Sequence, residues 1–512
     1  FMQSALGMFH AEEPAVLRAG WASLDALVKS LPKERYPLHV SWLKQQVADV
    51  AAEFKMAQRA AGVPKGADLT DLTLPAFGIV NGIGPLVAVY LQGLMTGTPE
   101  LREASASALG AVISLTPFAT LKPFVIQITG PLIRIVGDRF PWGVKAAILH
   151  TLSLLISKSA ILLKPFVPQL QTTFVKALSD TTRVVRMRGA SALSKLVSLS
   201  TRVEPLIIEL INTLATADPA VQYALLCALA GVLRGITKPL SAELYDKVQS
   251  TALSFLFGNE DELSVAAASL VGACGRWSSV EDLVDAVDES SQQRPEGWQR
   301  SLTVQQTHLA LLRTVPAAAL RPALPSMLAS AEEHAGDDKM DVRQPACHAI
   351  ARIAAAMAEP EAEDIKATEA EGGSVAELEE AVAGAVPRSV EGSLSRLLTD
   401  RVLEVRISAL HAIKTLCKLR PSLLRASNCS LGSAAVPGII ACCQDKRHMQ
   451  VSSAAQRTMM HLMLACDWTD EPPPALASNR EAAAFCSDFG KRNLKKLVGQ
   501  ESEPEHSDED PS

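Results

Sequence analysis

Pairs of aspartate and arginine at a fixed spacing are the side chains in this sequence that most resemble catalytic machinery. A carboxylate close to a guanidinium could exchange protons with a substrate or bind it. The pairs are Asp180 and Arg186, Asp337 and Arg343, and Asp400 and Arg406. The spacing of six residues is the same in all three. Because a protein rarely repeats its reaction site, this recurrence indicates a structural role.

Motifs that would place other reactive groups are absent from the sequence. It contains no HExxH, GxSxG, GxxxxGK[ST], dinucleotide-binding fingerprint or paired CxxC. The ten histidines are dispersed, and pairs such as His334 and His348 have no carboxylate at a metal-ligand spacing. We therefore predict no catalytic residue, no bound metal and no cofactor, and we expect that the protein is not an enzyme.

A repeated pentapeptide shows which elements position these side chains. Leu-Lys-Pro-Phe-Val occurs at Leu121–Val125 and again at Leu163–Val167, and Asp138 and Asp180 follow the two copies at the same offset. The chain therefore repeats every 42 residues. A period of about 40 to 47 residues is typical of HEAT and armadillo repeats, in which helical hairpins stack into a solenoid. We predict an all-α superhelix of about ten hairpins.

Each hairpin is expected to carry its Asp in the turn between the two helices. An apolar residue and a basic one then open the second helix, and small residues allow that helix to pack closely. We expect the Asp to cap the second helix, and the Arg six residues later to reach a neighbouring turn, giving a ladder along the stack. The Pro of each pentapeptide is expected in the first turn of a helix. Few strands are expected, since aromatic residues make up only 4% of the chain.

The chain divides by composition into six predicted segments. Glu359 to Glu380 contains nine acidic residues, one Lys and a Gly-Gly pair, so it has too little apolar surface to fold. The predicted segments are N-terminal helical repeats (1–95), basic repeats (96–260), further repeats (261–357), an acidic, largely disordered insertion (358–388), C-terminal repeats (389–498) and an acidic disordered tail (499–512).

Positive charge is concentrated in one part of an otherwise acidic chain. Residues 101–200 carry twelve Lys or Arg against three acidic residues, whereas the whole chain has a net charge of −6. A field of this kind attracts an acidic partner or nucleic acid, although a solvated helix face explains many such runs. Nucleic acid is less favoured because few aromatic residues interleave to stack on bases. The candidate binding residues are Arg102, Arg134, Arg139, Lys145, Arg183, Arg186 and Arg188.

The cysteines and the longest uncharged segment indicate in which cellular compartment the protein is expected. Nine cysteines with no CxxC pair are typical of free thiols in a reducing compartment, so we expect the cytosol. The segment from Leu72 to Pro99 has no charged residue, but its Pro and Gly residues predict a loop and a short helix over Leu86–Met95. We therefore expect no membrane span.

Residues 121–140 and 163–178, with their two Leu-Lys-Pro-Phe-Val copies, closely resemble the C-terminal region of the general control nonderepressible-one translational activator family. The resemblance is most specific over residues 96–215. It implies a cytosolic HEAT-repeat protein that associates with ribosomes on polysomes. In that family the protein activates the kinase of initiation factor two alpha during amino acid starvation or ribosome stalling, and the kinase docks through its RWD domain.

The resemblance also implies where the partner binds. The basic repeats from about Leu101 to Gly258 would form the docking surface for RWD domains. The family requires an arginine near the start of this region, for which Arg102 is the first candidate, followed by Arg134 and Arg139. Family members are far longer, so we expect this chain to be a fragment that acts with upstream ribosome-binding regions.

Two other functions remain open for a basic helical solenoid. One is a HEAT protein that binds the ribosome or ribosomal RNA directly and acts without the kinase. The other is a transport adaptor of the karyopherin type, which shares the repeat architecture.

Overall fold

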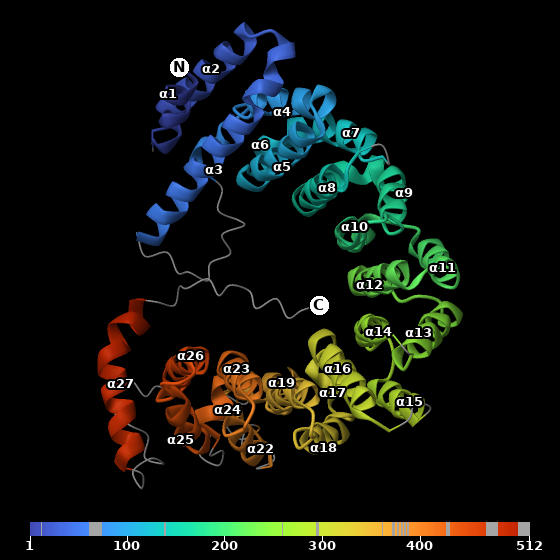
Figure 1. Cartoon of the computed structure of the whole chain (residues 1–512), viewed down its shortest axis with the longest axis vertical. Helices are drawn as coiled ribbons and strands as arrows, with labels where there is room; N and C mark the ends of the chain where they lie inside the picture. The colour runs from blue at the N-terminus through green and yellow to red at the C-terminus, as the bar shows by residue number, and fades with distance from the viewer. Residues whose placement is uncertain are drawn as a thin grey trace. The chain divides into compact units, whose positions relative to one another are not determined.

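The structure is a computed structural model in which every regular element of the described residues is a helix. The described residues are 1–11, 13–60, 74–137, 140–258, 260–292, 296–360, 362–370, 389–425, 431–466 and 480–499, together with a few single positions between 374 and 386. They fall into two compact units, Phe1–Leu244 and Tyr245–Gln500. The predicted all-α solenoid is thereby confirmed (Figure 1).

The first unit consists of five successive helix pairs and short connecting helices. Its α-helices are α1 (Met2–Gly7), α2 (Pro14–Ser30), α3 (Tyr36–Ala60), α4 (Gly84–Thr96), α5 (Pro99–Leu115), α6 (Phe118–Leu121), α7 (Val125–Ile135), α8 (Trp142–Leu163), α9 (Val167–Ala177), α10 (Arg183–Leu196), α11 (Val203–Leu214) and α12 (Pro219–Gly235). Its 3-10 turns are η1 (Met8–His10), η2 (Lys33–Arg35), η3 (Pro75–Gly78), η4 (Lys122–Phe124), η5 (Lys164–Phe166) and η6 (Val197–Leu199).

The second unit repeats the same plan. Its helices are α13 (Ala242–Leu256, which begins just before the boundary), α14 (Asp261–Cys274), α15 (Val280–Gln292), α16 (Trp298–Thr314), α17 (Ala317–Leu320), α18 (Leu324–His334), α19 (Met340–Met357), α20 (Ala362–Ala370), α22 (Ser389–Leu398), α23 (Leu403–Leu419), α24 (Pro421–Arg425), α25 (Leu431–Cys443), α26 (Met449–Ala465) and α27 (Arg480–Gly499). With the first unit, this gives ten hairpins in the described part of the chain, which agrees with the predicted number of about ten.

The second helices of the hairpins form a tightly packed row in each unit. In the first unit α5 packs on α8, α8 on α10, and α10 on α12, and we call these helices the inner row (Figure 1). Helices α7, α9 and α11 form the outer row. Apolar and small residues make the inner row possible, as shown by Val185 and Leu193, which are at most 1% exposed. A helix pair cannot bury its apolar stripe alone, so the neighbouring pair completes the core.

Glycine permits the closest approach between neighbouring second helices. A Cβ added to Gly272 on α14 would lie 2.7 Å from the carbonyl carbon of Ala310 on α16. Two helices can approach this closely only where one of them has no side chain.

The prolines of the repeated pentapeptide lie in 3-10 turns, where we predicted the first turn of an α-helix. Pro123 is in η4 and Pro165 in η5, and each turn leads directly into the outer helix, α7 or α9. Because proline has no N–H to donate, a tight turn before the helix accommodates it as well as the first helical turn does.

Apolar stretches of the first unit are core helices. The predicted short helix is α4, with thirteen residues, preceded by η3, while Leu72 and Thr73 lie outside the described residues. By length and composition alone, Trp142–Ala177 could cross a membrane, although half of its most apolar window is buried in the protein. This stretch leaves helical geometry at Ser159 and packs between α5 and α10. Its apolar character is therefore explained by packing.

The acidic insertion is partly helical, where we expected a largely disordered segment. Helix α20 occupies Ala362–Ala370, in which Ala, Glu and Lys are good helix formers. Much of the remaining insertion, and residues 500–512 of the predicted acidic tail, lie outside the described residues.

Candidate docking surface

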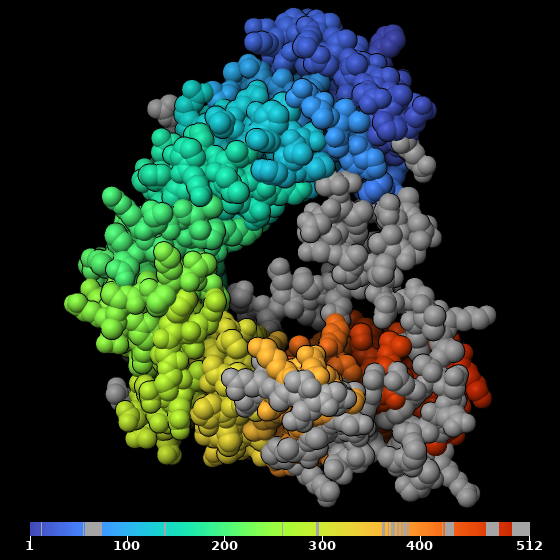
Figure 2. All heavy atoms as spheres, turned by 180° about the vertical axis from the view of Figure 1, so that it is seen from behind, coloured from blue at the N-terminus to red at the C-terminus, as the bar shows by residue number. Residues whose placement is uncertain are grey.

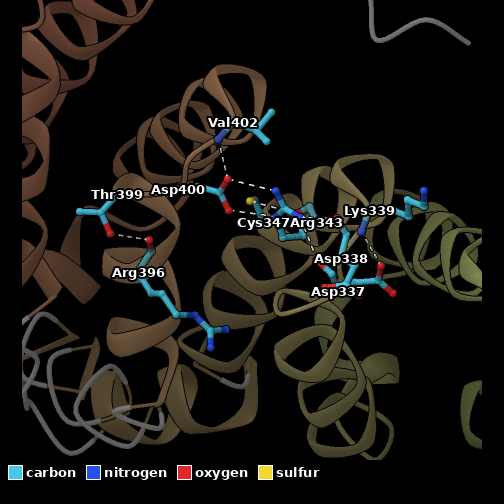
Figure 3. A network of polar contacts seen from close by, with 9 residues as sticks. All are labelled: Asp337, Asp338, Lys339, Arg343, Cys347, Arg396, Thr399, Asp400 and Val402. Carbon is cyan, nitrogen blue, oxygen red and sulfur yellow. Dashed lines mark hydrogen bonds and ion pairs between the residues drawn. The ribbon is translucent and has the colours of Figure 1, made fainter.

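The repeated Asp and Arg residues form contacts between hairpins in the second unit. The Arg343 guanidinium on α19 donates to the main-chain oxygens of Asp337 and Asp338 in its own turn, at 2.8 and 3.0 Å. It also meets the Asp400 carboxylate of the next hairpin, with Nε 3.0 Å from Oδ2 and Nη2 3.0 Å from Oδ1 (Figure 3). The predicted ladder is therefore confirmed here, as a bidentate ion pair.

A second rung and a lysine variant follow the same geometry. Arg406 on α23 lies 3.3 Å from Asp445 of the following hairpin. The hydrogen bond from the His448 ring, helped by main-chain N–H groups, lowers the pKa of Asp445 to about 2. In the first unit, Lys145 on α8 takes the place of the arginine, with Nζ 2.7 Å from Asp180 Oδ2.

Asp180 and Asp400 do not cap the second helices of their hairpins, contrary to the prediction, whereas Asp218 caps α12 by accepting from the N–H of Val221 at 3.0 Å. Oδ1 of Asp180 accepts from the N–H of Thr182 at 2.9 Å, and Asp400 accepts from Val402 at 2.8 Å. The N-cap positions of α10 and α23 are instead Thr182 and Val402, which make no side-chain cap hydrogen bond. An Asp side chain that binds the N–H two residues later closes an Asx turn, so it shapes the loop before the helix.

Three of the seven predicted binding residues are held by the scaffold itself. Lys145 pairs with Asp180, as described. Arg186 is only 7% exposed and donates to the main-chain oxygens of Asp180 and Thr181. Arg102 donates to the main-chain oxygens of Leu94, Met95 and Gly97, and its guanidinium carbon lies 4.6 Å from the centre of the Phe140 ring. These side chains close turns and join hairpins.

Three other predicted residues are exposed. Arg134 lies near the end of α7 on the outer row, where Nη2 is 2.9 Å from Met95 Sδ. Arg183 and Arg188 lie on α10 in the inner row. Arg139 is outside the described residues.

Four exposed residues of α10 define what we call the α10 ridge: Arg183, Val184, Arg188 and Lys195. Residues 184, 188 and 195 recur at helical spacing, so they lie on one face. Arg183 stands beside them with its guanidinium carbon 4.9 Å from the centre of the Tyr223 ring on α12. This contact holds one face of the guanidinium against an aromatic ring.

Arg188 is oriented by the neighbouring helix. Its Nη1 lies 2.7 Å from Nδ1 of His150 on α8. Burial, together with the charges of Arg188 and Lys195, lowers the pKa of His150. The ring therefore stays neutral near pH 7 and can accept the hydrogen bond from the arginine.

No acidic side chain occurs on α8 or α10, so the charge of the ridge is not neutralised from its own two helices. Exposed apolar side chains occur near the starts of the two packed helices: Val184 on α10 is 44% exposed, and Trp142 on α8 is 55% exposed. Protein–protein interfaces are typically rich in arginine together with aromatic and aliphatic side chains. The sequence analysis did not select Trp142, Val184 or Tyr223. These residues lie near the starts of helices that become neighbours only in the folded structure.

Metal ligands and thiols are the other groups in the described ranges whose chemistry can be assessed. No group of three or more His, Cys, Asp or Glu side chains there could hold a metal ion. Burial raises the pKa values of Cys274, Cys347 and Cys417 to about 12. These thiols are therefore not thiolates near pH 7 and are poor nucleophiles.

Comparison of the whole chain with known proteins supports the same family that residues 121–140 and 163–178 resemble. Residues 1–81 match the family model described as stalled ribosome sensor GCN1-like, HEAT repeats. Protein ILITYHIA of Arabidopsis thaliana is 30% identical over 510 residues, covering 99% of this chain and 17% of the relative. The eIF-2-alpha kinase activator GCN1 of Dictyostelium discoideum is 31% identical, covering 90% of this chain and 16% of the relative.

The human relative agrees with this result, and a solved structure shares the fold. The human stalled ribosome sensor GCN1 is 39% identical over 277 residues, which cover 54% of this chain and 10% of that protein. The Kap95:Nup1 complex contains a chain with a TM-score of 0.51 and 14% identity, covering 97% of this chain and 64% of that one, which shows the fold alone. This chain thus spans less than a fifth of the length of these curated relatives, and it is a GCN1-like HEAT-repeat protein.

Proposed function

We propose that this chain is a non-catalytic scaffold that binds an RWD domain of the initiation factor two alpha kinase through the α10 ridge. Acting with ribosome-binding regions outside this chain, it promotes activation of that kinase in the cytosol, on polysomes, during amino acid starvation or ribosome stalling. The names of the Dictyostelium and human relatives, a kinase activator and a sensor of stalled ribosomes, support this role.

The observation that carries the proposal is the ridge itself. Arg183 and Arg188 are exposed and oriented by Tyr223 and His150, and their helix carries no acidic residue. Side chains that are held before binding lose less conformational entropy when a partner docks. An acidic surface on the partner is required for complementarity, and Val184 supplies apolar area beside the charges. Arg134 and Arg139 are further candidates, and Arg102, Lys145 and Arg186 contribute by shaping the turns.

A direct test measures the affinity of a purified kinase RWD domain for the whole chain. The double variant Arg183→Glu/Arg188→Glu should weaken binding about tenfold or more, because two attractive contacts become repulsive. The matched control is Arg18→Glu/Arg35→Glu, which reverses two exposed arginines in the first repeats. If the wild type, the ridge variant and the control variant bound the RWD domain with equal affinity, the α10 ridge would not be the docking surface.

The transport-adaptor alternative has weaker support. The likeness to the Kap95:Nup1 structure is one of fold, and many unrelated functions share a fold. Retention of a Ran-type GTPase by this chain, with no binding of an RWD domain, would favour that alternative.

A further inference from the structure

The inner row of the second unit carries positive charge on four consecutive helices. This row consists of α14, α16, α19, α23 and α26, each packed against the next. In the space-filling view, the described atoms of the unit follow one another in chain order from yellow-green to red (Figure 2). From α16 onward, each helix bears Lys or Arg at its middle or in its second half. We call these residues the inner basic stripe: Arg313, Arg352, Lys414, Lys418 and Arg457.

Packing leaves one side of these helices for the stripe. Helix α19 packs on α16, α23 and the outer helix α18, and α23 packs on α19, α26 and the outer helix α22. Side chains that are not buried beyond the first turn therefore point away from the outer helices. On α23, residues 411, 414 and 418 recur at helical spacing, so they lie on this side. All five residues of the stripe are exposed or half-buried.

Basic side chains recur at equivalent positions of successive repeats. His348, His411 and Arg457 each follow, by six residues, the buried valine near the start of their helix. Arg313 and Lys414 each follow that valine by nine residues. Equivalent residues of stacked repeats come to lie side by side, so this charge is arranged along the row.

The inner helices contain almost no negative charge of their own. Helices α16 and α26 have no acidic residue, and the only ones of α19 and α23 are Asp341 and Glu404, each the second residue of its helix. The outer side of the same unit is different, since α15 contains five acidic residues and α18 contains two. The inner face of this unit is therefore suited to an acidic ligand.

Residues 501–512 have the complementary charge. They consist of six acidic residues, three Ser, two Pro and one His, and they lie outside the described residues. A segment of this composition cannot bury a core of its own. It follows α27 after one residue, and α27 packs on α25 and α26, the last hairpin of the row.

The segment is long enough to reach across the stripe. Twelve extended residues span about 40 Å. Packed helices lie about 8–10 Å apart, so the distance from α26 to α16 is roughly 30 Å. A chain that leaves the last hairpin can therefore cross all four helices.

We propose that residues 501–512 bind in extended form across the inner basic stripe, so that the chain covers its own basic face. Because the segment is tethered, its effective concentration is in the millimolar range. Such a concentration populates the bound state even when each solvent-screened charge pair contributes little. This inference goes beyond the docking of an RWD domain, because it concerns other helices and another occupant.

Nucleic acid fits this face less well. Helices α19, α23 and α26 contain no Phe, Tyr or Trp on which unpaired bases could stack. Any nucleic acid would also have to compete with a tethered acidic segment.

Carbodiimide coupling of the whole chain, followed by mass spectrometry, tests the contact. The reagent joins a Lys amine only to a carboxylate in contact with it. The wild type should give links from Lys414 and Lys418 to residues 501–510, and added salt should reduce their yield because it screens exposed charges. In Arg313→Glu/Arg457→Glu, which keeps both lysines, the yield should fall roughly fivefold or more, since attraction becomes repulsion.

The matched control is Arg401→Glu/Arg447→Glu. It makes the same change of charge at two exposed arginines of the same unit, in the turns before α23 and α26. These links should form in the control as they do in the wild type. Equal yields in the stripe variant and the control, or no links in the wild type, would overturn the inference.

A second measurement leaves every described residue unchanged. Glu→Gln and Asp→Asn at the six acidic positions of 501–512 remove the charge of the segment. A fluorescent peptide of residues 500–512 should bind this neutralised protein roughly tenfold more tightly than the wild type, because the tethered segment no longer competes. Equal affinity of the peptide for the two proteins would contradict occupation of the stripe.

Affinity for the RWD domain separates this inference from the proposed function. Arg313→Glu/Arg457→Glu should bind the RWD domain as the wild type does. If the fluorescent peptide were instead lost from Arg183→Glu/Arg188→Glu and retained by Arg313→Glu/Arg457→Glu, the segment would bind the α10 ridge and the inference would be wrong. Single-stranded RNA that bound the stripe equally well in the wild type and the neutralised protein would also contradict it.

Discussion

Arg343 and Asp400 are 57 residues apart in the sequence and join two successive hairpins through two contacts of 3.0 Å. Their side chains are only 12% and 15% exposed, so water screens the pair weakly. Because Arg343 also binds main-chain oxygens in its own turn, one guanidinium fixes two loops at once. The contact recurs one hairpin later between Arg406 and Asp445.

Loss of this contact should destabilise the second unit. Arg343→Ala is expected to cost roughly 2–4 kcal/mol, because it leaves the partly buried Asp400 carboxylate without its partner. Urea unfolding would measure the loss, and hydrogen exchange should accelerate first in α19 and α23. In a cycle with Asp400→Asn, the two changes should be non-additive by roughly 0.5–3 kcal/mol. Strict additivity would show that the side chains are not coupled.

Arg186 and Arg188 should behave oppositely although only one residue, Met187, lies between them. Arg186→Ala removes the hydrogen bonds to Asp180 and Thr181, so it should lower the melting temperature by several degrees, with a loss of roughly 1.5–3 kcal/mol. Arg188→Ala should leave the melting temperature within about a degree of the wild type, since Arg188 is exposed. Similar melting curves for both variants would contradict the division into scaffold and ridge.

Gly272→Ala should destabilise the second unit, because the new methyl group would meet the Ala310 backbone. Overpacking of this kind costs roughly 1–3 kcal/mol. Gly392→Ala is the control, since Gly392 lies in α22 with open space around it and should gain up to about 1 kcal/mol of helix propensity. Thermal unfolding of both variants measures the difference, and an equal response at the two sites would argue against close packing of α14 on α16.

His308 should make stability depend on pH. It is 1% exposed, and burial, with His334 nearby, lowers the pKa of His308 to about 4 from an ordinary value of 6.5. Between these values the unfolded chain binds the proton and the folded chain does not, so stability falls as pH decreases from 6.5 toward 4. From pH 7 to pH 5 the loss should be roughly 2 kcal/mol.

The matched variant for this effect is His308→Leu, which replaces the titratable ring by an apolar side chain of similar size in the core. Its unfolding free energy should lose less than that of the wild type between pH 7 and pH 5, as measured by urea titration at each pH. The same pH dependence in both proteins would show that His308 is not the group responsible.

The sequence predicted the fold well because a solenoid is specified by a local rule repeated many times. The spacing of Leu-Lys-Pro-Phe-Val identified the repeat length, and the Asp-to-Arg spacing identified the contact later observed between Arg343 and Asp400. Helix α20 was missed, because overall charge was given more weight than the helix propensity of Ala and Glu.

The candidate site was predicted less completely than the fold. Charge alone grouped Arg186 with Arg188, whereas their difference depends on which face of α10 each occupies. Trp142, Val184 and Tyr223 gave no signal in the sequence, because an apolar residue at the start of a helix is usually part of the core. Their grouping depends on three helices that lie next to one another only after folding.

Calorimetric titration of the kinase RWD domain into the whole chain tests the central proposal most directly. The account predicts saturable binding by the wild type, and affinity reduced about tenfold or more by Arg183→Glu/Arg188→Glu with no change in melting temperature. Binding that is absent in the wild type, or equally strong in the variant, would contradict the assignment of the α10 ridge as the docking surface.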